Sequence, residues 1–184
     1  MPIECRLYET LTEPSLLDGV WNLLCRYDHD FIPPLSARDY TYQSDLTIHA
    51  PTKQEPNPYY EQLTKQSFVL AQDKDKVVGF MSYRPHYVSE DLNDQVETIY
   101  VTTVIVDESY RGQGVAMRLY TELAIIAKQQ DEPIMTRTWS TNESHIRILN
   151  RIGMREIKRI VDGRGAGLDT VYYRKHDEEE PAQS

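Results

Sequence analysis

The sequence predicts an α/β (α+β) fold in which helices cover both faces of a mixed central sheet. Strand-like and helix-like segments alternate along the chain, and that alternation is typical of a mixed sheet. Residues 101–106 are all β-branched, which indicates a central strand covered on both faces. The 184 residues are enough for one domain with one core.

The first half of the chain begins with a strand and a helix. Residues 3–8 predict the strand, and the Thr-Glu-Pro-Ser sequence at 12–15 has the chemistry of a helix start. Apolar residues then recur at helical spacing as far as Leu24. Segment 28–60 differs, since it holds five prolines among tyrosines and acids. Such a segment is either functional or poorly ordered, and we expect only one short helix in it, near 59–65.

The second half predicts a hairpin, a long central strand and two further helices. Residues 67–72 and 76–83 flank an Asp-Lys-Asp turn, which is a hairpin signal. The run 97–106 is the central strand, and apolar residues mark one helical face across 112–129. A strand, a capped helix and two strands joined by a glycine-rich turn complete the chain. The strands are residues 133–140, 155–161 and 169–175. The helix runs from a cap at Thr141 or Asn142 to Arg151.

The charge and composition exclude several classes of function. The chain has 20 basic and 29 acidic residues and a net charge of −9, whereas nucleic-acid-binding proteins carry a basic footprint. No apolar run approaches the ~20 residues of a membrane helix, and the first ten residues lack signal-peptide features. We therefore expect a cytoplasmic protein with no nucleic-acid or membrane partner. Residues 1–175 are expected to form the single domain, and 176–184, with four acids, a disordered tail.

The cysteines and histidines do not predict a disulfide or a metal site. Cys5 and Cys25 are too few for a disulfide framework, and their apolar neighbours predict free, buried thiols. The five histidines show no ligand spacing, so we expect no bound metal.

The most informative segment is 104–123, where a buried strand ends, a loop with two glycines follows and a helix begins. Glycine lets the backbone approach a ligand closely. The first amides of a helix lack internal partners and carry the positive end of its dipole, so together they predict an anion site suited to a pyrophosphate. Three motifs compete. A Walker loop is absent, a dinucleotide fingerprint needs glycine where Met117 stands, and R-x-x-G-x-A is formed by Arg111, Gly114 and Ala116.

The third motif resembles the acyl-CoA loop of the GNAT N-acetyltransferase superfamily. Residues 142–154 resemble that family's N-x(10)-G-[FM] helix, with Asn142 at its start. The order of elements also matches, and the resemblance covers roughly residues 67–175. It implies the acyl-CoA N-acyltransferase (GNAT-like) fold, whose central sheet is splayed, and acetyl-CoA as the co-substrate.

Carried onto this sequence, the resemblance implies coenzyme contacts at eleven positions. Backbone groups of Val104, Ile105 and Val106 would pair with the pantetheine arm like an added strand, and loop amides would hold the pyrophosphate. Arg111 would add a charge-assisted contact. Asn142 would either help to hold the coenzyme or serve only as a helix cap. The loop residues are Gly112, Gln113, Gly114, Val115, Ala116 and Met117.

The sequence departs from the family pattern at the expected general acid. Many members place a tyrosine seven residues after this asparagine to protonate the departing thiolate, and Leu149 stands there in this chain. A thiol has a pKa near ~8.5, so a thiolate is a fair leaving group without that help. Water, Tyr120, Tyr172 or Tyr173 could substitute for the missing tyrosine.

The general base and the acceptor pocket are less clearly marked. Glu97, near the start of the central strand, is the candidate catalytic base, with a solvated strand-end acid as the alternative. Arg137 stands where some relatives carry an acid, and it would suit an anionic substrate. We expect the acceptor pocket to be built from 28–60 and the neighbouring strands, where Tyr40 and Tyr42 could stack on a cation.

These observations predict an N-acetyltransferase that moves an acetyl group to a primary amine by direct attack in a ternary complex. The acceptor is a small-molecule amine or a peptide amine, and a homodimer is left open. The alternative is a weak or inactive GNAT-like domain that binds acyl-CoA as a sensor or scaffold, which Leu149 motivates. A nucleotide-binding domain is a third interpretation, against which Met117 and the missing lysine argue.

Overall fold

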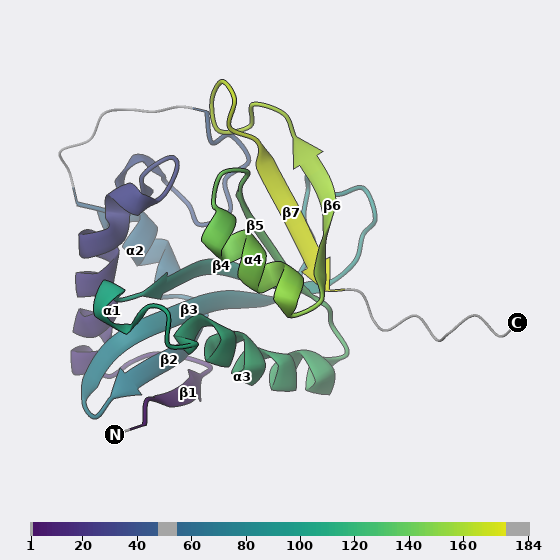
Figure 1. The fold of residues 1–184 in the computed structure, drawn as a ribbon. Helices are drawn as coiled ribbons and strands as arrows, with labels where there is room; N and C mark the ends of the chain where they lie inside the picture. The colour runs from purple at the N-terminus through teal and green to yellow at the C-terminus, as the bar shows by residue number, and fades with distance from the viewer. Residues whose placement is uncertain (1, 48–54, 176–184) are drawn as a thin grey trace, which may run out of the picture.

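The computed structural model describes residues 2–47 and 55–175, and Figure 1 shows their arrangement. The acidic tail expected at 176–184 lies outside the described residues. Among the described residues, no helix has the length and apolar character needed to cross a membrane. The strands are β1 (Glu4–Tyr8), β2 (Ser67–Asp73), β3 (Lys76–Tyr87), β4 (Thr98–Val106), β5 (Ile134–Trp139), β6 (Met154–Ile160) and β7 (Thr170–Lys175). The α-helices are α1 (Pro14–Tyr27), α2 (Asn57–Leu63), α3 (Val115–Gln130) and α4 (Glu143–Arg151), with short 3-10 helices η1 (Asp28–Asp30), η2 (Leu35–Ala37) and η3 (Glu108–Tyr110).

The seven strands form one mixed sheet in the order β1-β2-β3-β4-β5-β7-β6. Only β4 and β5 pair in parallel, and every other neighbouring pair is antiparallel. The β-branched run 101–106 lies in β4, at the centre of the sheet, as predicted. The mixed sheet with helices on both faces is therefore confirmed.

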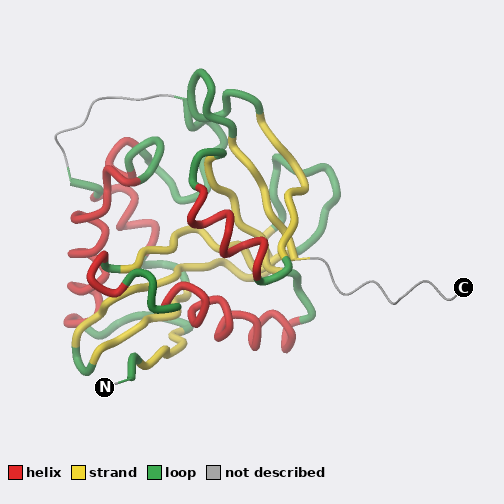
Figure 2. The backbone as a smooth tube through the Cα atoms, viewed as in Figure 1, coloured by secondary structure: helices red, strands yellow, loops and turns green. Residues whose placement is uncertain are grey.

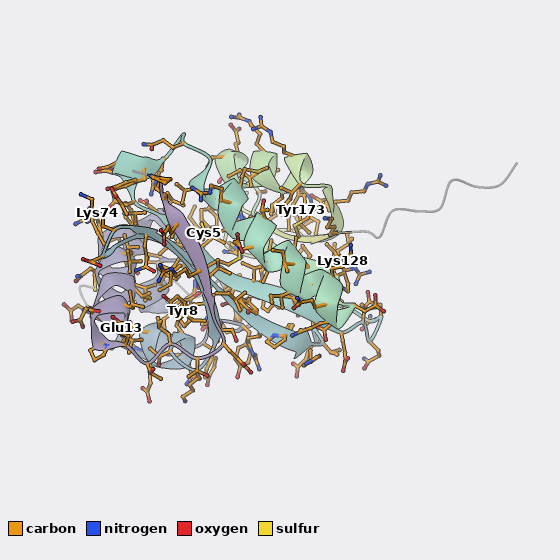
Figure 3. All side chains as sticks on the ribbon, turned by 90° about the horizontal axis from the view of Figure 1, so that it is seen from below. Cys5, Tyr8, Glu13, Lys74, Lys128 and Tyr173 are labelled. Carbon is orange, nitrogen blue, oxygen red and sulfur yellow. The ribbon has the colours of Figure 1, made fainter. Side chains whose placement is uncertain are left out.

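Two hydrophobic clusters lie on opposite faces of the sheet. α3 and α4 pack over one cluster, and α1 and α2 pack over the other (Figure 1). Side chains alternate between the faces along each strand. On β1, for example, Cys5 joins the cluster under α3 whereas Tyr8 joins the cluster under α1 (Figure 3). Cys5 and Cys25 are both free, and each is half-buried where the sequence predicted full burial.

The sheet divides at its centre, between β4 and β5. The two strands pair over three residues each, from Ile99 opposite Ile134 to Val101 opposite Thr136. The register of β3 against β4 then shifts so that Thr102 is an extra residue, a β-bulge. A bulge bends its strand and ends regular pairing. Beyond it the strands β5, β7 and β6 turn away from β2, β3 and β4 (Figure 2), which gives the splayed sheet implied by the family resemblance.

Two helix boundaries differ from the sequence prediction for local reasons. α3 begins at Val115 and not at residue 112, because Gly112 and Gly114 have positive φ angles that no helix contains. α2 begins at Asn57, before the expected start, because Pro58 fits the first turn of a helix.

Candidate active site

The open edge of β4 lies beside the bulge. The amide of Asp107 donates to the carbonyl oxygen of Val78 on β3, at 2.8 Å. Because the peptide groups of a strand point alternately to either side, those of Val104 and Val106 face away from β3, toward the gap beside β5. Arg111 confirms this direction for Val106, since its Nε donates to the Val106 carbonyl oxygen at 2.9 Å. β4 therefore presents the peptide group of Val104 and the amide of Val106 to the gap, where an extended ligand could add as a strand.

A glycine loop joins this edge to the N-terminus of α3. Gly112 and Gly114 have φ angles of +75° and +77°. Within the described residues, and apart from the adjacent residues in the chain, no atom lies within 4 Å of where a Cβ would stand on either glycine. The first intrahelical bond runs from the Arg118 amide to the Gly114 carbonyl, at 3.1 Å. The amides of residues 115–117 therefore have no acceptor within the helix. They carry the positive end of its dipole, which suits an anion such as a pyrophosphate.

The open edge and the glycine loop line one cleft with a volume of about 600 Å³. Its walls also include the C-terminal half of β5, residues along α4 as far as Arg151, and part of segment 27–38. Of the eleven predicted coenzyme positions, only Gln113 does not line it, because its side chain turns back to the Ser109 carbonyl oxygen. The positions that line the cleft are Val104, Ile105, Val106, Arg111, Gly112, Gly114, Val115, Ala116, Met117 and Asn142.

Asn142 occupies the N-cap position of α4 but does not cap it with its side chain. Its Nδ2 instead donates to Thr138 Oγ1 on β5, at 3.0 Å. Both residues line the cleft. The interpretation of Asn142 as a helix cap alone is therefore not supported, and its amide is held toward the gap between the strands.

The structure does not bring Glu97 into the cleft. Glu97 is exposed and precedes the first residue of β4, whereas the cleft begins beyond the bulge at the other end of that strand. Its neighbours are His86 and Glu132, and possible ligand atoms of the three residues lie within 4.8 Å of one another. Among the described residues this is the one group that could share a metal ion, and it lies outside the cleft.

The expected general acid and its possible substitutes all lie outside the cleft. Leu149, in place of the family's tyrosine, is fully buried in the cluster under α3 and α4. Tyr120, Tyr172 and Tyr173 do not line the cleft. The Tyr120 hydroxyl instead hydrogen-bonds to Nε2 of His145, at 2.9 Å, and His145 does line the cleft.

His145 is a cleft residue that sequence reasoning did not select. Burial lowers the pKa of its imidazole to about 4, so the ring is neutral near pH 7. Burial raises the pKa of its partner Tyr120. Neither group is therefore a strong acid at neutral pH.

The wall opposite α4 comes from the proline-rich segment 28–60 and the adjoining Tyr27. The segment is the expected one, but the residues that line the cleft are not the expected tyrosines. Tyr27, Asp30, Phe31 and Arg38 line the cleft there, and no motif marked Tyr27, Phe31 or Arg38. The predicted tyrosines lie elsewhere. Tyr40 stacks on Tyr42, with the ring centroids 5.9 Å apart, and Arg84 lies over Tyr42.

The cleft is strongly positive although the chain is acidic. Five arginines line it, and Asp30 is the only lining carboxylate among the described residues. Asp30 is itself 3.5 Å from the Nη2 of Arg111. The other four arginines are Arg38, Arg137, Arg147 and Arg151.

Known proteins resemble this chain in sequence pattern and in fold. A model of the acetyltransferase (GNAT) family matches residues 33–154. A search of curated proteins found no significant sequence match.

Several solved structures share the fold. Ribosomal-protein-alanine N-acetyltransferase from Brucella melitensis superposes with a TM-score of 0.66 and 16% identity, over 94% of this chain and 98% of that one. An N-acetyltransferase from Staphylococcus aureus Mu50 gives 0.64 and 15%, over 95% and 98%. The protein yncA from Salmonella typhimurium, whose structure contains its cofactor acetyl-CoA, gives 0.64 and 15%, over 100% and 99%.

Proposed function

The chain belongs to the GNAT family of acetyltransferases, and from that premise we propose that it transfers the acetyl group of acetyl-CoA to a primary amine. The observation that carries this proposal is the divided sheet. The open edge of β4 meets a positive glycine loop in the same cleft, so one ligand with an extended arm and a pyrophosphate would fit both.

In this proposal each end of the coenzyme meets a different part of the cleft. The amides of residues 115–117 and the Arg111 guanidinium would hold the phosphates, with Arg147 and Arg151 on α4 nearby. The carbonyl of Val104 and the amide of Val106 would pair with the pantetheine arm. That pairing would lead the thioester to the bulge at Thr102, where β4 and β5 separate.

The reaction would be a direct attack by the neutral amine nitrogen on the thioester carbonyl carbon. The carbon–nitrogen bond forms, the carbon–sulfur bond breaks, and the thiolate leaves with the bonding electron pair while the nitrogen loses a proton to water. The amide of Val104 faces the gap and would donate to the developing oxyanion. The rest of the rate enhancement would come from positioning.

The positive cleft would assist the loss of that proton. Nearby cations disfavour an ammonium group and lower its pKa. Arg38 and Arg137 line the cleft, so they would increase the fraction of neutral amine without a dedicated base. Leu149 replaces the tyrosine acid and is buried away from the cleft, so the thiolate would leave without that acid. The thiol pKa near ~8.5 makes this possible.

A sensor that binds acetyl-CoA without turnover is the second candidate, and the missing tyrosine is the observation that favours it. Both candidates predict coenzyme binding, and only the enzyme predicts release of free thiol when an amine is present.

The first experiment is thermal melting with and without saturating acetyl-CoA, with ATP and NAD as controls. Ligand at ~100 times its Kd stabilises by about 2.7 kcal/mol, which raises the Tm of a chain of this size by roughly 5–10 °C. A shift with acetyl-CoA alone supports the coenzyme site, and release of thiol with an amine panel then supports the enzyme. No shift with acetyl-CoA would overturn both candidates.

A further inference from the structure

Three arginines are buried around one wall of the cleft, and they come from distant parts of the chain. Arg38 is 6% exposed, Arg164 is 2% exposed, and the Arg137 side chain is 5% exposed. Arg38 and Arg137 line the cleft itself. Arginine is rarely buried unless an anion compensates its charge, so this grouping needs an explanation.

All three guanidinium groups donate to backbone carbonyls of the proline-rich segment. Arg38 donates from Nε and Nη2 to the Pro33 carbonyl oxygen, at 3.1 and 2.9 Å. Arg137 Nη2 reaches the Gln43 carbonyl oxygen at 2.6 Å, and Arg164 Nη1 reaches that of Ile32 at 2.7 Å. These bonds hold the segment against the sheet. Carbonyl groups carry no net charge, however, so these bonds do not neutralise Arg38 and Arg137.

Negative charge is scarce around Arg38 and Arg137. The ion pairs within residues 2–47 and 55–175 do not include Arg38. Arg137 has one, a distant contact of 4.0 Å between its Nη1 and Oδ2 of Asp91. The same Oδ2 also accepts a hydrogen bond from the Tyr172 hydroxyl. Burial lowers the pKa of Arg38 to about 10, and repulsion from Arg137 acts in the same direction, against attraction from Asp28. Burial also acts to lower the pKa of Arg137, but Tyr100, Tyr172 and Asp91 raise it overall.

These arginines lie on the acceptor side of the sheet. Arg137 follows Thr136, the last residue of β5 that pairs with β4, so it stands at the fork where the thioester would lie. By strand alternation it shares a face with Met135, which packs against Tyr100 and Tyr172 and not under α3. The coenzyme loop and α4 lie on the α3 side. A second substrate that approaches from the other face would therefore meet Arg38 and Arg137 first.

We propose that Arg38 and Arg137 bind the carboxylate of the acceptor, so that the amine acetylated by this protein belongs to an amino acid or a similar amino carboxylate. A guanidinium binds a carboxylate with two parallel hydrogen bonds, and a carboxylate here would compensate the buried charge. The inference rests on the proposed function, whose acceptor it narrows. Polyamines and simple alkylamines are excluded as preferred acceptors because they would bring only positive charge to this wall.

Two aromatic rings suggest which amino acids to test. The rings of Phe31 and Trp139 lie 5.8 Å apart between centroids, and both line the cleft near the arginines. They form an apolar wall against which a side chain could pack. L-phenylalanine with phenethylamine, and L-methionine with 3-(methylthio)propylamine, are therefore suitable pairs, since each pair differs only in the carboxylate.

The first test measures thiol release by the wild-type protein with each pair. We expect kcat/KM for the amino acid to exceed that for its decarboxylated partner by about 100-fold, because the amine lacks the carboxylate that the two guanidinium groups would bind. An amine that reacts as fast as its amino acid would overturn the inference and leave the acetyltransferase proposal standing.

The second test uses Arg137→Met, with Arg155→Met as the matched control. Arg155 is an exposed cation on β6 outside the cleft, so both variants remove one positive charge. Arg137→Met should reduce the ratio of the two kcat/KM values by about 10-fold or more and leave the KM for acetyl-CoA within about twofold. The ratio does not depend on how much protein is folded, so partial misfolding of Arg137→Met does not obscure it. An unchanged ratio would contradict the inference.

A binding measurement separates the two proposals if no amine releases thiol. In the presence of CoA, N-acetyl-L-phenylalanine should raise the Tm of the wild type, and N-acetylphenethylamine should not. If acetyl-CoA itself causes no shift, the proposed function fails. L-phenylalanine alone would then still raise the Tm of the wild type but not of Arg137→Met if the carboxylate site exists. Equal effects of the charged and uncharged ligands, or no effect of either, would overturn the inference.

Discussion

The two halves of the cleft are built in different ways. The coenzyme half is built mainly from one short stretch, since the end of β4, the glycine loop and the start of α3 all lie within residues 104–117, and α4 adds Arg147 and Arg151. The acceptor half joins two distant parts of the chain. Phe31 and Arg38 come from one part, and Arg137 and Trp139 come from another, about a hundred residues later. Local geometry of the backbone makes the first half, whereas side chains from distant segments make the second. The comparison explains why one half carries a readable motif and the other does not.

The largest expected effect comes from breaking the local half at Gly114. A β-branched side chain at a φ of +77° is strained, and its Cβ would occupy the space left open for a phosphate. We expect Gly114→Val to weaken acetyl-CoA binding by about 100-fold or more, measured by calorimetry.

Gly153→Val is the matched control for that prediction. Gly153 has a φ of +87°, its Cβ position also has no neighbour within 4 Å, and it does not line the cleft. Both variants should lose about 1–2 kcal/mol of unfolding free energy. Equal loss of acetyl-CoA binding in the two variants would show that strain, and not access for the phosphates, decides the effect.

The next effect concerns His145, which lies in the coenzyme half, within residues 142–154 but at none of the defining positions of that motif. Its pKa is about 4 in the folded protein and near 6.5 in the unfolded chain. Because the folded state binds its proton less readily, stability is full above pH 6.5 and falls as the pH drops toward 4. The contribution lost between pH 7 and pH 5 is about 2 kcal/mol.

Urea unfolding of wild type and His145→Gln at the two pH values checks this prediction. Groups that titrate equally in both proteins cancel in the comparison. The variant should lose less stability than the wild type on acidification. The same loss in both would show that His145 reaches water and titrates normally.

Arg111 tests where the boundary between the halves lies. Its Nε bonds to the Val106 carbonyl on the coenzyme side, while its Nη2 lies 3.5 Å from Asp30 on the acceptor side. We expect Arg111→Met to raise the KM for acetyl-CoA by about 10-fold and to leave the KM for the amine nearly unchanged. The opposite pattern in steady-state kinetics would assign Arg111 to the acceptor half.

The smallest expected effect is at Glu97, the base suggested by the sequence. Its exposed position before β4, outside the cleft, predicts that Glu97→Gln changes kcat by less than about twofold. A fall in kcat of about 100-fold or more, the size expected on loss of a general base, would show that Glu97 takes the proton of the amine.

The comparison also separates what could be predicted from what could not. The central position of β4 followed from its unbroken β-branched run, and the coenzyme loop followed from glycines before an amphipathic helix. Glu97 and the tyrosines Tyr40 and Tyr42 were reasonable candidates by residue type. They lie outside the cleft because their positions depend on the register of strands and the path of a long loop.

The sequence alone determined the order of strands and helices, the turn at Gly112 and Gly114, and the free amides at the start of α3. Those features depend on backbone angles and hydrogen bonds between residues close in the chain, so the local sequence is sufficient. Only the tertiary structure decided that the bulge at Thr102 opens the sheet and that Arg38, Arg137 and Arg164 lie close enough to repel one another. That meeting depends on how distant segments pack together, and no spacing along the chain encodes the distance between such side chains.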